Sequence, residues 1–111
     1  MSATPSLSFT GLVIVMAVGL APMAEEFMFR FFLYGVLKRY CGLLTAAVLS
    51  ALMFAAMHLN LASLPSLFIL ALCFTIAYEA TGSLLVTISM HALFNLTMFL
   101  QMLAHTPSLS Q

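Results

Sequence analysis

The sequence predicts an all-α protein, a polytopic bundle of four to five transmembrane helices. Of its 111 residues, 64% are hydrophobic and 5% are charged, and the mean hydropathy is +1.18. In soluble domains about a quarter of the residues are charged, so this composition excludes an ordinary soluble domain. Proline, glycine and polar positions divide the apolar residues into segments of helical length. We expect one membrane domain, residues 1–111.

The same composition limits the function. The chain has three basic and three acidic residues and no net charge, so no basic run points to nucleic acid as a partner. Cys41 and Cys73 do not have metal-ligand spacing and are interpreted as apolar packing residues. The N-terminal residues lack the basic start of a secretory signal. The first apolar run is therefore expected to remain as a helix.

Turn residues set the expected helix boundaries. A spanning helix needs about 20 apolar residues. Pro22 suits the first turn of a helix, and Gly82 suits a helix C-terminus. The expected helices are Leu7–Leu20, Pro22–Tyr40, Leu43–His58, Pro65–Ala80 and Leu84–Ala104.

Half of the formal charges fall within six positions of the second expected helix. Glu25, Glu26 and Arg30 each cost about 2.5–3.5 kcal/mol at membrane depth, so such residues usually serve a function. Glu26 and Arg30 are four residues apart and can pair on one helix face. Glu25 points about 100° away, which leaves its carboxylate free. The cations Lys38 and Arg39 at the helix end are typical of topology anchors.

The other unusual side chains are expected at a similar depth. At 1.5 Å of rise per residue, Glu25 lies ~23 Å and His58 ~24 Å from the Gly42 turn. His91 and Asn95 lie ~14 and ~20 Å from the same side of the membrane. Residues from three helices therefore converge on one layer, which predicts a single site.

This set of side chains predicts hydrolytic chemistry. Desolvation favours the neutral form of a carboxylate, which makes it a usable general base near neutral pH. Imidazoles and a carboxamide can transfer protons and stabilise an oxyanion. Glu25, His58 and His91 could instead hold a zinc ion with a water. Zinc and a metal-free mechanism both stay open.

Each feature alone also has a structural interpretation. The structural interpretation of Glu26 and Arg30 is a packing ion pair, and that of His91 and Asn95 is hydrogen bonding between helices. His58 and Glu79 both suit a membrane interface. Only the joint pattern favours a functional site.

Three ordered motifs resemble a known family. Glu25–Arg30 (EEFMFR) matches EExxxR, Phe54–His58 (FAAMH) matches FxxxH, and His91–Asn95 (HALFN) matches HxxxN. In this order and on successive helices, the three motifs resemble those of the CPBP intramembrane proteases. That family comprises the type II CAAX prenyl endopeptidases and the bacterial Abi and bacteriocin-processing relatives. The resemblance covers residues 21–100.

The resemblance implies peptide-bond hydrolysis inside the membrane, with a role for each motif residue. Glu25 would activate water, and His58 would assist proton transfer or bind a metal. His91 and Asn95 would stabilise the oxyanion. The residues implied to shape the site are Glu26 and Arg30.

Two departures from the family stand out. Phe31 follows the motif arginine where the family commonly has glycine, whose small size permits close helix approach. Family members also usually have further helices before the first motif. The chain is therefore expected to be a truncated or minimal version of a longer fold, and a homo-oligomer stays open.

The favoured function is an intramembrane endopeptidase that acts on a membrane-associated or CAAX-type peptide or protein. The expected location is a bacterial cell membrane. One alternative is a non-catalytic member of the same fold, in bacteriocin immunity or as a scaffold. The other is a fragment of a proton-coupled transporter.

Overall fold

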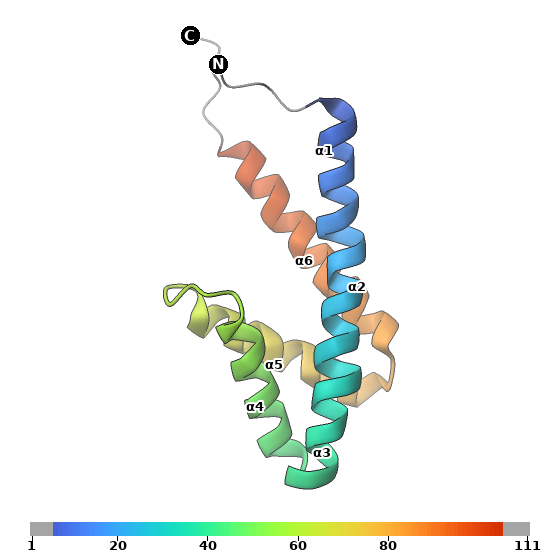
Figure 1. The fold of residues 1–111 in the computed structure, drawn as a ribbon, viewed down its shortest axis with the longest axis vertical. Coiled ribbons are helices and arrows are strands. Elements are labelled where there is room, and N and C mark those ends of the chain that lie inside the picture. The colour runs from blue at the N-terminus through green and yellow to red at the C-terminus, as the bar shows by residue number, and fades with distance from the viewer. Residues whose placement is uncertain (1–5, 106–111) are drawn as a thin grey trace.

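The computed structural model describes residues 6–105, which form four helices joined by short turns and one loop (Figure 1). The first helix is continuous over 35 residues, Leu7–Cys41. It contains two π-helical segments, η1 and η2. Its segments are α1 (Leu7–Ile14), η1 (Val15–Leu20), α2 (Ala21–Glu26), η2 (Phe27–Tyr34) and α3 (Gly35–Cys41). The remaining helices are α4 (Leu43–Ala56), α5 (Leu64–Thr81) and α6 (Leu84–Ala104).

The expected break between two helices at Ala21–Pro22 is wrong. Proline inside a helix lacks an N–H, and its ring crowds the carbonyl four residues earlier. Here the preceding turns are π-helical, and the Ala21 N–H reaches back five residues to Met16 O. Such local widening allows proline inside membrane helices. The first two expected helices are therefore one, which gives four helices rather than five.

Two glycines end helices as expected. Gly42 has φ +82° and ψ 170°, a conformation essentially confined to glycine. Gly82 is left-handed at φ +65°, and its N–H donates to Tyr78 O at 2.8 Å. Helix α4 ends at Ala56, so His58 lies beyond the helix rather than in its last turn as expected.

The fold prediction of an all-α transmembrane bundle is confirmed. Within the described residues, three helices are long and apolar enough to cross a membrane: Leu7–Cys41, Leu64–Thr81 and Leu84–Ala104. The 14 residues of α4 make a shorter apolar helix. The chain is an integral membrane protein.

The helices pack around the middle of the long helix. Helix α6 contacts η1, α2 and η2, whereas α4 packs against η2 and α3, and α5 packs on α4 and α6 (Figure 1). The buried core is small and rich in alanine, which lets helices approach closely. It has two clusters: Phe29, Ala51, Phe54 and Ala71; and Tyr34, Ala46 and Ala47.

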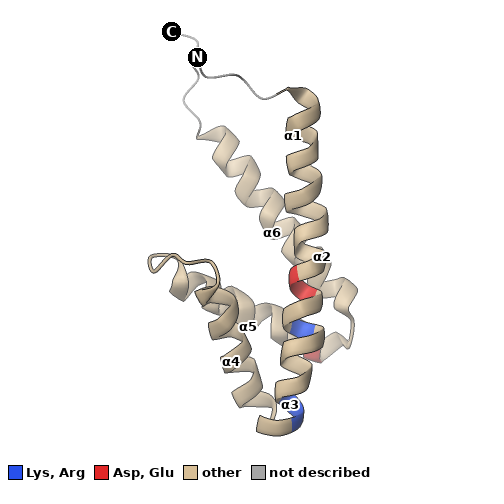
Figure 2. Cartoon of the chain, viewed as in Figure 1, with Lys and Arg blue, Asp and Glu red and all other residues tan. Residues whose placement is uncertain are grey.

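The charged residues gather at two levels of the long helix (Figure 2). One level is at α2 and η2, where the two acids and the arginine of the first motif lie. The other is near the Gly42 turn, where Lys38 forms a salt bridge with Glu79 of α5. Glu79 was expected only as an interfacial residue, but it also ties α5 to α3. The Lys38–Glu79 pair is separate from Glu25, Glu26 and Arg30, so the charged residues of the first motif interact only locally.

Candidate active site

A buried ion pair lies at the centre of the bundle. Arg30 Nη1 donates to Glu26 Oε2 at 2.9 Å, as their spacing of four residues predicts. The side chains are only 2% and 0% exposed. Arg30 Nη2 also donates to the backbone oxygen of Ala71 at 3.0 Å, which links the long helix to α5. Additional hydrogen bonds offset part of the cost of burying an ion pair, so this second bond helps to keep Arg30 in place. Among the described residues, Glu26 Oε1 and Arg30 Nε have no hydrogen-bond partner.

His91 lies between the two motif carboxylates. Its Nδ1 is 3.3 Å from Glu26 Oε2, and its Nε2 is 3.2 Å from Glu25 Oε2. The imidazole comes from α6 and both carboxylates come from α2, so the contact joins the first and third motifs. When a carboxylate contacts one ring nitrogen of a histidine, the contact sets the orientation of the ring and hence the direction of the other ring nitrogen. Glu26 therefore orients the His91 nitrogen that faces Glu25.

Glu25 differs from its neighbours in exposure. Its side chain is 35% exposed, whereas those of Glu26, Arg30 and His91 are at most 4% exposed. The expectation that Glu25 has no partner is incorrect, because His91 contacts it. Glu25 is nevertheless the part of the network that solvent or substrate can reach.

Two phenylalanines enclose the buried part of this network. The Arg30 Cζ atom lies 4.9 Å from the ring centroid of Phe54 and 5.3 Å from that of Phe74. A cation at this distance from an aromatic face is attracted by the ring quadrupole. The His91 ring stacks on Phe74 with centroids 5.1 Å apart and meets Phe54 nearly edge-on at 5.9 Å. Both rings are almost completely buried, so they keep Arg30 and His91 away from water.

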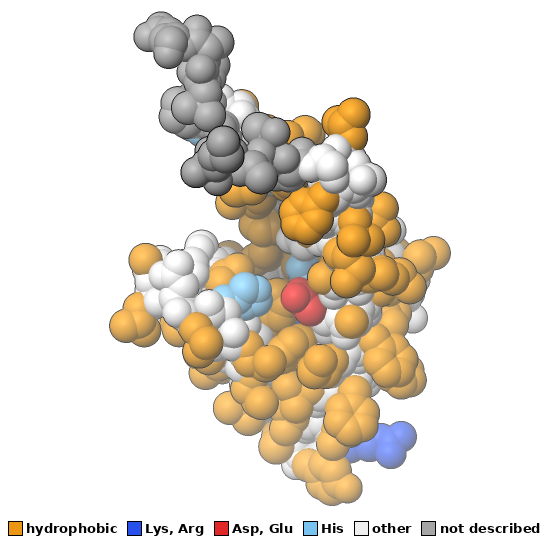
Figure 3. All heavy atoms as spheres, turned by 45° about the horizontal axis from the view of Figure 1, so that its top comes forward, with side chains coloured by type: hydrophobic (Ala, Val, Ile, Leu, Met, Phe, Trp, Pro, Cys, Tyr) orange, Lys and Arg blue, Asp and Glu red, His pale blue; other side chains and the backbone are white. Residues whose placement is uncertain are grey.

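His58 lies at the edge of the site and is exposed. Its Nδ1 is 2.8 Å from the backbone oxygen of Phe54. Since a carbonyl only accepts, Nδ1 carries the hydrogen and Nε2 is left as an acceptor. The Phe54 ring also lies 5.0 Å from the His58 ring, so Phe54 contacts both histidine rings of the motifs. Histidine and acidic side chains lie beside a hollow in a mostly apolar face (Figure 3).

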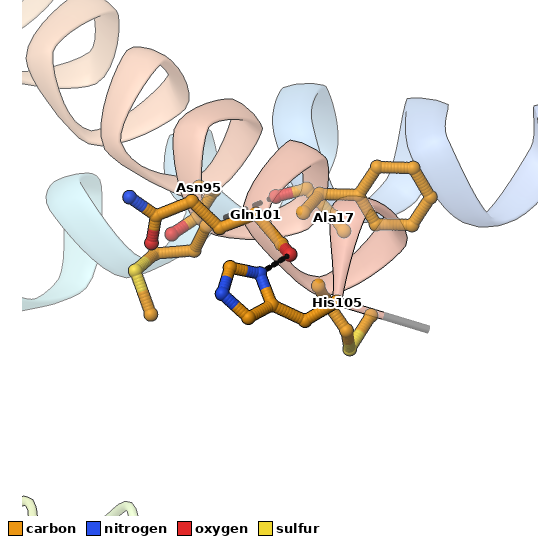
Figure 4. A pocket seen from close by; sticks show the side chains of 7 residues that line it. Ala17, Asn95, Gln101 and His105 are labelled. Atoms are coloured by element: carbon orange, nitrogen blue, oxygen red, sulfur yellow. Dashed lines mark hydrogen bonds between the residues drawn. The ribbon is translucent and has the colours of Figure 1, made fainter. Parts of the chain in front are cut away.

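Asn95 points toward the long helix rather than toward the carboxylates. Its Nδ2 donates to the backbone oxygen of Ala17 at 2.9 Å (Figure 4). This bond joins α6 to the π-helical segment η1. Asn95 also lines an open apolar groove of about 600 Å³. The other residues that line the groove are Ala17, Met98, Phe99, Gln101, Met102 and His105.

The three donors considered for zinc do not come together as a ligand set. Glu25 and His91 are in contact, but His58 lies past the end of α4, with Nδ1 bonded to Phe54 O. Among residues 6–105, no three His, Cys, Asp or Glu side chains are placed to hold a metal ion. The residues present therefore do not fit a zinc site, and the chemistry proposed below uses protein groups and water.

Phe31, the departure from the family pattern, lies on the outer surface of the long helix. It is 55% exposed and stacks on Phe27 with ring centroids 5.1 Å apart. The large side chain thus faces away from the helix contacts around Arg30. The substitution for glycine leaves the buried network undisturbed.

The three motifs supply most, but not all, of the residues at the site. The structure joins Glu25, Glu26, Arg30 and His91 by direct contacts and places His58 and Asn95 at its edges. Phe74 and the Ala71 carbonyl, both on α5, were not expected. An apolar side chain and a backbone oxygen carry no sequence signal of their own in an apolar helix.

Comparison with known proteins agrees with the motifs. A family model described as type II CAAX prenyl endopeptidase Rce1-like matches residues 7–97. No curated protein and no solved structure gave a significant match. The matched segment includes the long helix, all three motifs and the contacts between them. Because it spans most of the 111 residues, the chain belongs to the type II CAAX prenyl endopeptidase Rce1-like family, as its resemblance to the CPBP proteases indicated.

Proposed function

We propose that the chain is an intramembrane endopeptidase in which Glu25 is the general base. The observation that carries this proposal is the position of Glu25 at the accessible end of an otherwise buried polar network. Arg30 neutralises Glu26, Glu26 orients His91, and His91 contacts Glu25. A buried network of this kind costs free energy in a membrane, so a functional role is the expected reason for it.

The proposed reaction begins with a water molecule at Glu25. The Glu25 carboxylate accepts a proton from the water while the water oxygen bonds to the scissile carbonyl carbon. The resulting tetrahedral oxyanion collapses and the C–N bond breaks. The proton held by Glu25 passes to the leaving nitrogen, which gives an amine and a carboxylic acid. A base positioned in this way typically contributes about 10²–10⁴-fold to the rate.

Three further side chains are proposed to assist this reaction. Asn95 uses one amide hydrogen for Ala17 O, which leaves the other to donate to an oxyanion. His91 is proposed as a second donor through Nε2, the ring nitrogen on the side of the accessible Glu25. His58, with Nε2 free to accept, is proposed as a partner in proton transfer. Donors that are positioned in advance stabilise an oxyanion at little reorganisation cost.

Glu26 and Arg30 are proposed to shape the site rather than to contact substrate. Both are buried, and their partners are each other, His91 and the Ala71 carbonyl. Their opposite charges largely cancel, so the buried pair adds little net charge beside Glu25. This division of roles fits the spacing of the first motif.

The apolar groove beside Asn95 favours a substrate with an apolar portion. It lies between Ala17 of the long helix and the second half of α6 (Figure 4). Four of its seven lining residues are apolar, and the polar ones are Asn95, Gln101 and His105. The family's description names prenylated CAAX substrates, and a prenyl group is an apolar chain. We propose that the prenyl group of the substrate occupies the groove. We also propose that the protein acts on such peptides or proteins in a bacterial cell membrane.

The test is cleavage by the purified protein in detergent or lipid nanodiscs. A prenylated peptide and its unprenylated copy are compared, each with and without a metal chelator, and products are identified by mass spectrometry. We expect cleavage of the prenylated peptide, slower cleavage of the unprenylated one, and no effect of chelator. Failure to cleave either peptide would argue against the activity. Loss of cleavage with chelator would restore the zinc interpretation.

One observation favours a second candidate, a non-catalytic membrane scaffold of the same fold. The Glu25 carboxylate already contacts His91, so the polar network has internal partners without a substrate. On this alternative, Glu25→Gln would leave the cellular phenotype unchanged and no peptide would be cleaved.

A further inference from the structure

Helix α5 carries none of the three motifs, yet it contacts the site at two points one turn apart. The Ala71 carbonyl accepts a hydrogen bond from Arg30 Nη2, and the Phe74 ring lies against both Arg30 and His91. Phe74 is only 2% exposed and Ala71 is 0% exposed. The side of α5 that faces the site is therefore packed against the polar network.

The contacts of His91 constrain it in two different ways. The carboxylates of Glu26 and Glu25 meet its two ring nitrogens near the edge of the ring, at 3.3 and 3.2 Å. Both contacts are long for hydrogen bonds to a carboxylate, so alone they restrain the ring only weakly about its second side-chain torsion, which is broad in histidine. Phe74 instead lies against the face of the ring, with centroids 5.1 Å apart and planes 28° from parallel. Offset stacking at this distance is a favoured aromatic geometry.

We propose that Phe74 is a positioning residue that fixes the plane of the His91 imidazole and so aims its Nε2 at Glu25. Phe54 meets the same imidazole at 69° with centroids 5.9 Å apart, so it does not cover the face of the ring that Phe74 covers. Without the Phe74 ring, the imidazole can tilt into the vacated space, and Nε2 moves away from the carboxylate. Misplacement by about 1 Å can cost on the order of 10²-fold in rate.

The kinetic test rests on the proposed function and uses the full chain. Phe74→Leu is expected to lower kcat by about 10-fold with little change in KM, because positioning rather than substrate binding is lost. Phe74→Tyr keeps the ring and should recover most of kcat. Phe68→Leu is the matched control, since Phe68 lies on the same helix and packs against the apolar cluster around Phe54. Equal losses in Phe74→Leu and Phe68→Leu would overturn the proposal.

A second readout does not need activity. Diethyl pyrocarbonate acylates accessible histidines, and peptide mapping by mass spectrometry gives the rate for each one. His58 and His105 are exposed and serve as internal references for the buried His91. We expect His91 to react several times faster in Phe74→Leu than in the parent, and at the parent rate in Phe74→Tyr and Phe68→Leu. Unchanged His91 reactivity in Phe74→Leu would refute the positioning role.

The two readouts separate the two hypotheses. If no variant cleaves peptide but Phe74→Leu still exposes His91, the proposed function fails and the positioning role stands. If Phe74→Leu does not fold, Phe74→Met is used, since its flexible thioether fills the space without providing a ring face. Thermal unfolding of each variant in detergent accompanies both measurements.

Discussion

At the scale of single residues, two adjacent glutamates occupy very different environments. Glu26 is completely buried and bound by Arg30 and His91, whereas Glu25 is 35% exposed. The difference follows from helix geometry, because adjacent residues point about 100° apart. One faces the packed interior and the other faces the accessible side. Neighbouring identical residues can thus serve structure and chemistry separately.

Removing the buried cation is expected to be costly. Arg30→Ala leaves the Glu26 carboxylate buried without its cation and the Ala71 carbonyl without this donor. Breaking a buried pair in this way costs about 3–5 kcal/mol of stability. Arg39→Ala, which removes an exposed cation from the same helix, is the control and should change stability little. Unfolding in detergent followed by circular dichroism measures both. Equal, small effects would mean that the ion pair does not hold the bundle.

The sequence predicted those residue contacts that follow from charge and spacing. The Glu26–Arg30 pair follows from a separation of four. Helix rise placed His91 in one layer with the carboxylates but did not predict its direct contacts with them. The roles of Phe74 and Ala71 could not be predicted, because an apolar residue in an apolar helix does not indicate which neighbour it will face. The hydrogen bond from Asn95 to Ala17 O depends on how α6 crosses the long helix, which spacing alone does not determine.

At the scale of elements, the long helix carries the site because it is not interrupted. The predicted break at Pro22 would have let the first motif begin a separate helix. Instead η1 and η2 flank α2, so π-helical segments lie on both sides of the two glutamates. Such segments occur often at functional sites. Sequence signals for proline assume standard α-helical turns, and they fail where a π-helical segment accommodates the ring.

The turn at Gly42 is expected to be the most sensitive point of the backbone. Its φ of +82° with ψ of 170° is strained for any residue with a Cβ, so Gly42→Ala should cost about 1–3 kcal/mol. Gly11→Ala is the matched control, because Gly11 lies inside α1 with nothing within 4 Å of an added Cβ. It should stabilise the protein by about 0.5–1 kcal/mol. Chemical unfolding in detergent compares the two. A Gly42→Ala protein as stable as the parent would contradict the assigned turn.

At the scale of the whole molecule, the bundle is organised by one helix that is longer than the membrane. Thirty-five residues extend about 52 Å, against a hydrocarbon core of about 30 Å. The helix must tilt or extend beyond the core, and a single crossing would place its two ends on opposite sides of the bilayer. The all-α class, the Gly42 and Gly82 turns and the last helix followed from composition and turn residues. The tilt and crossing of the helices depend on packing, which the sequence pattern does not specify.

This topology makes a direct labelling prediction. Cys41, next to the Gly42 turn, should react with a membrane-impermeant maleimide from one side of sealed vesicles only. Ser8→Cys, near the start of the long helix, should react only from the other side. Cys73, near the middle of α5, should be protected by lipid. Cys41→Ser provides the control for background. Labelling of Cys41 and Ser8→Cys from the same side would exclude a single crossing by the long helix.

The central claim is that the Glu25 carboxylate performs the chemistry of this bundle. Glu79 offers a matched control, because it is also a partly exposed glutamate in a membrane helix, at 29% against 35%. The decisive measurement is the rate of cleavage of a prenylated peptide by Glu25→Gln and Glu79→Gln at equal amounts of folded, membrane-inserted protein. We expect Glu25→Gln to lose at least about 10²-fold in rate and Glu79→Gln to cleave at nearly the parent rate. Cleavage by Glu25→Gln at the parent rate would contradict the account.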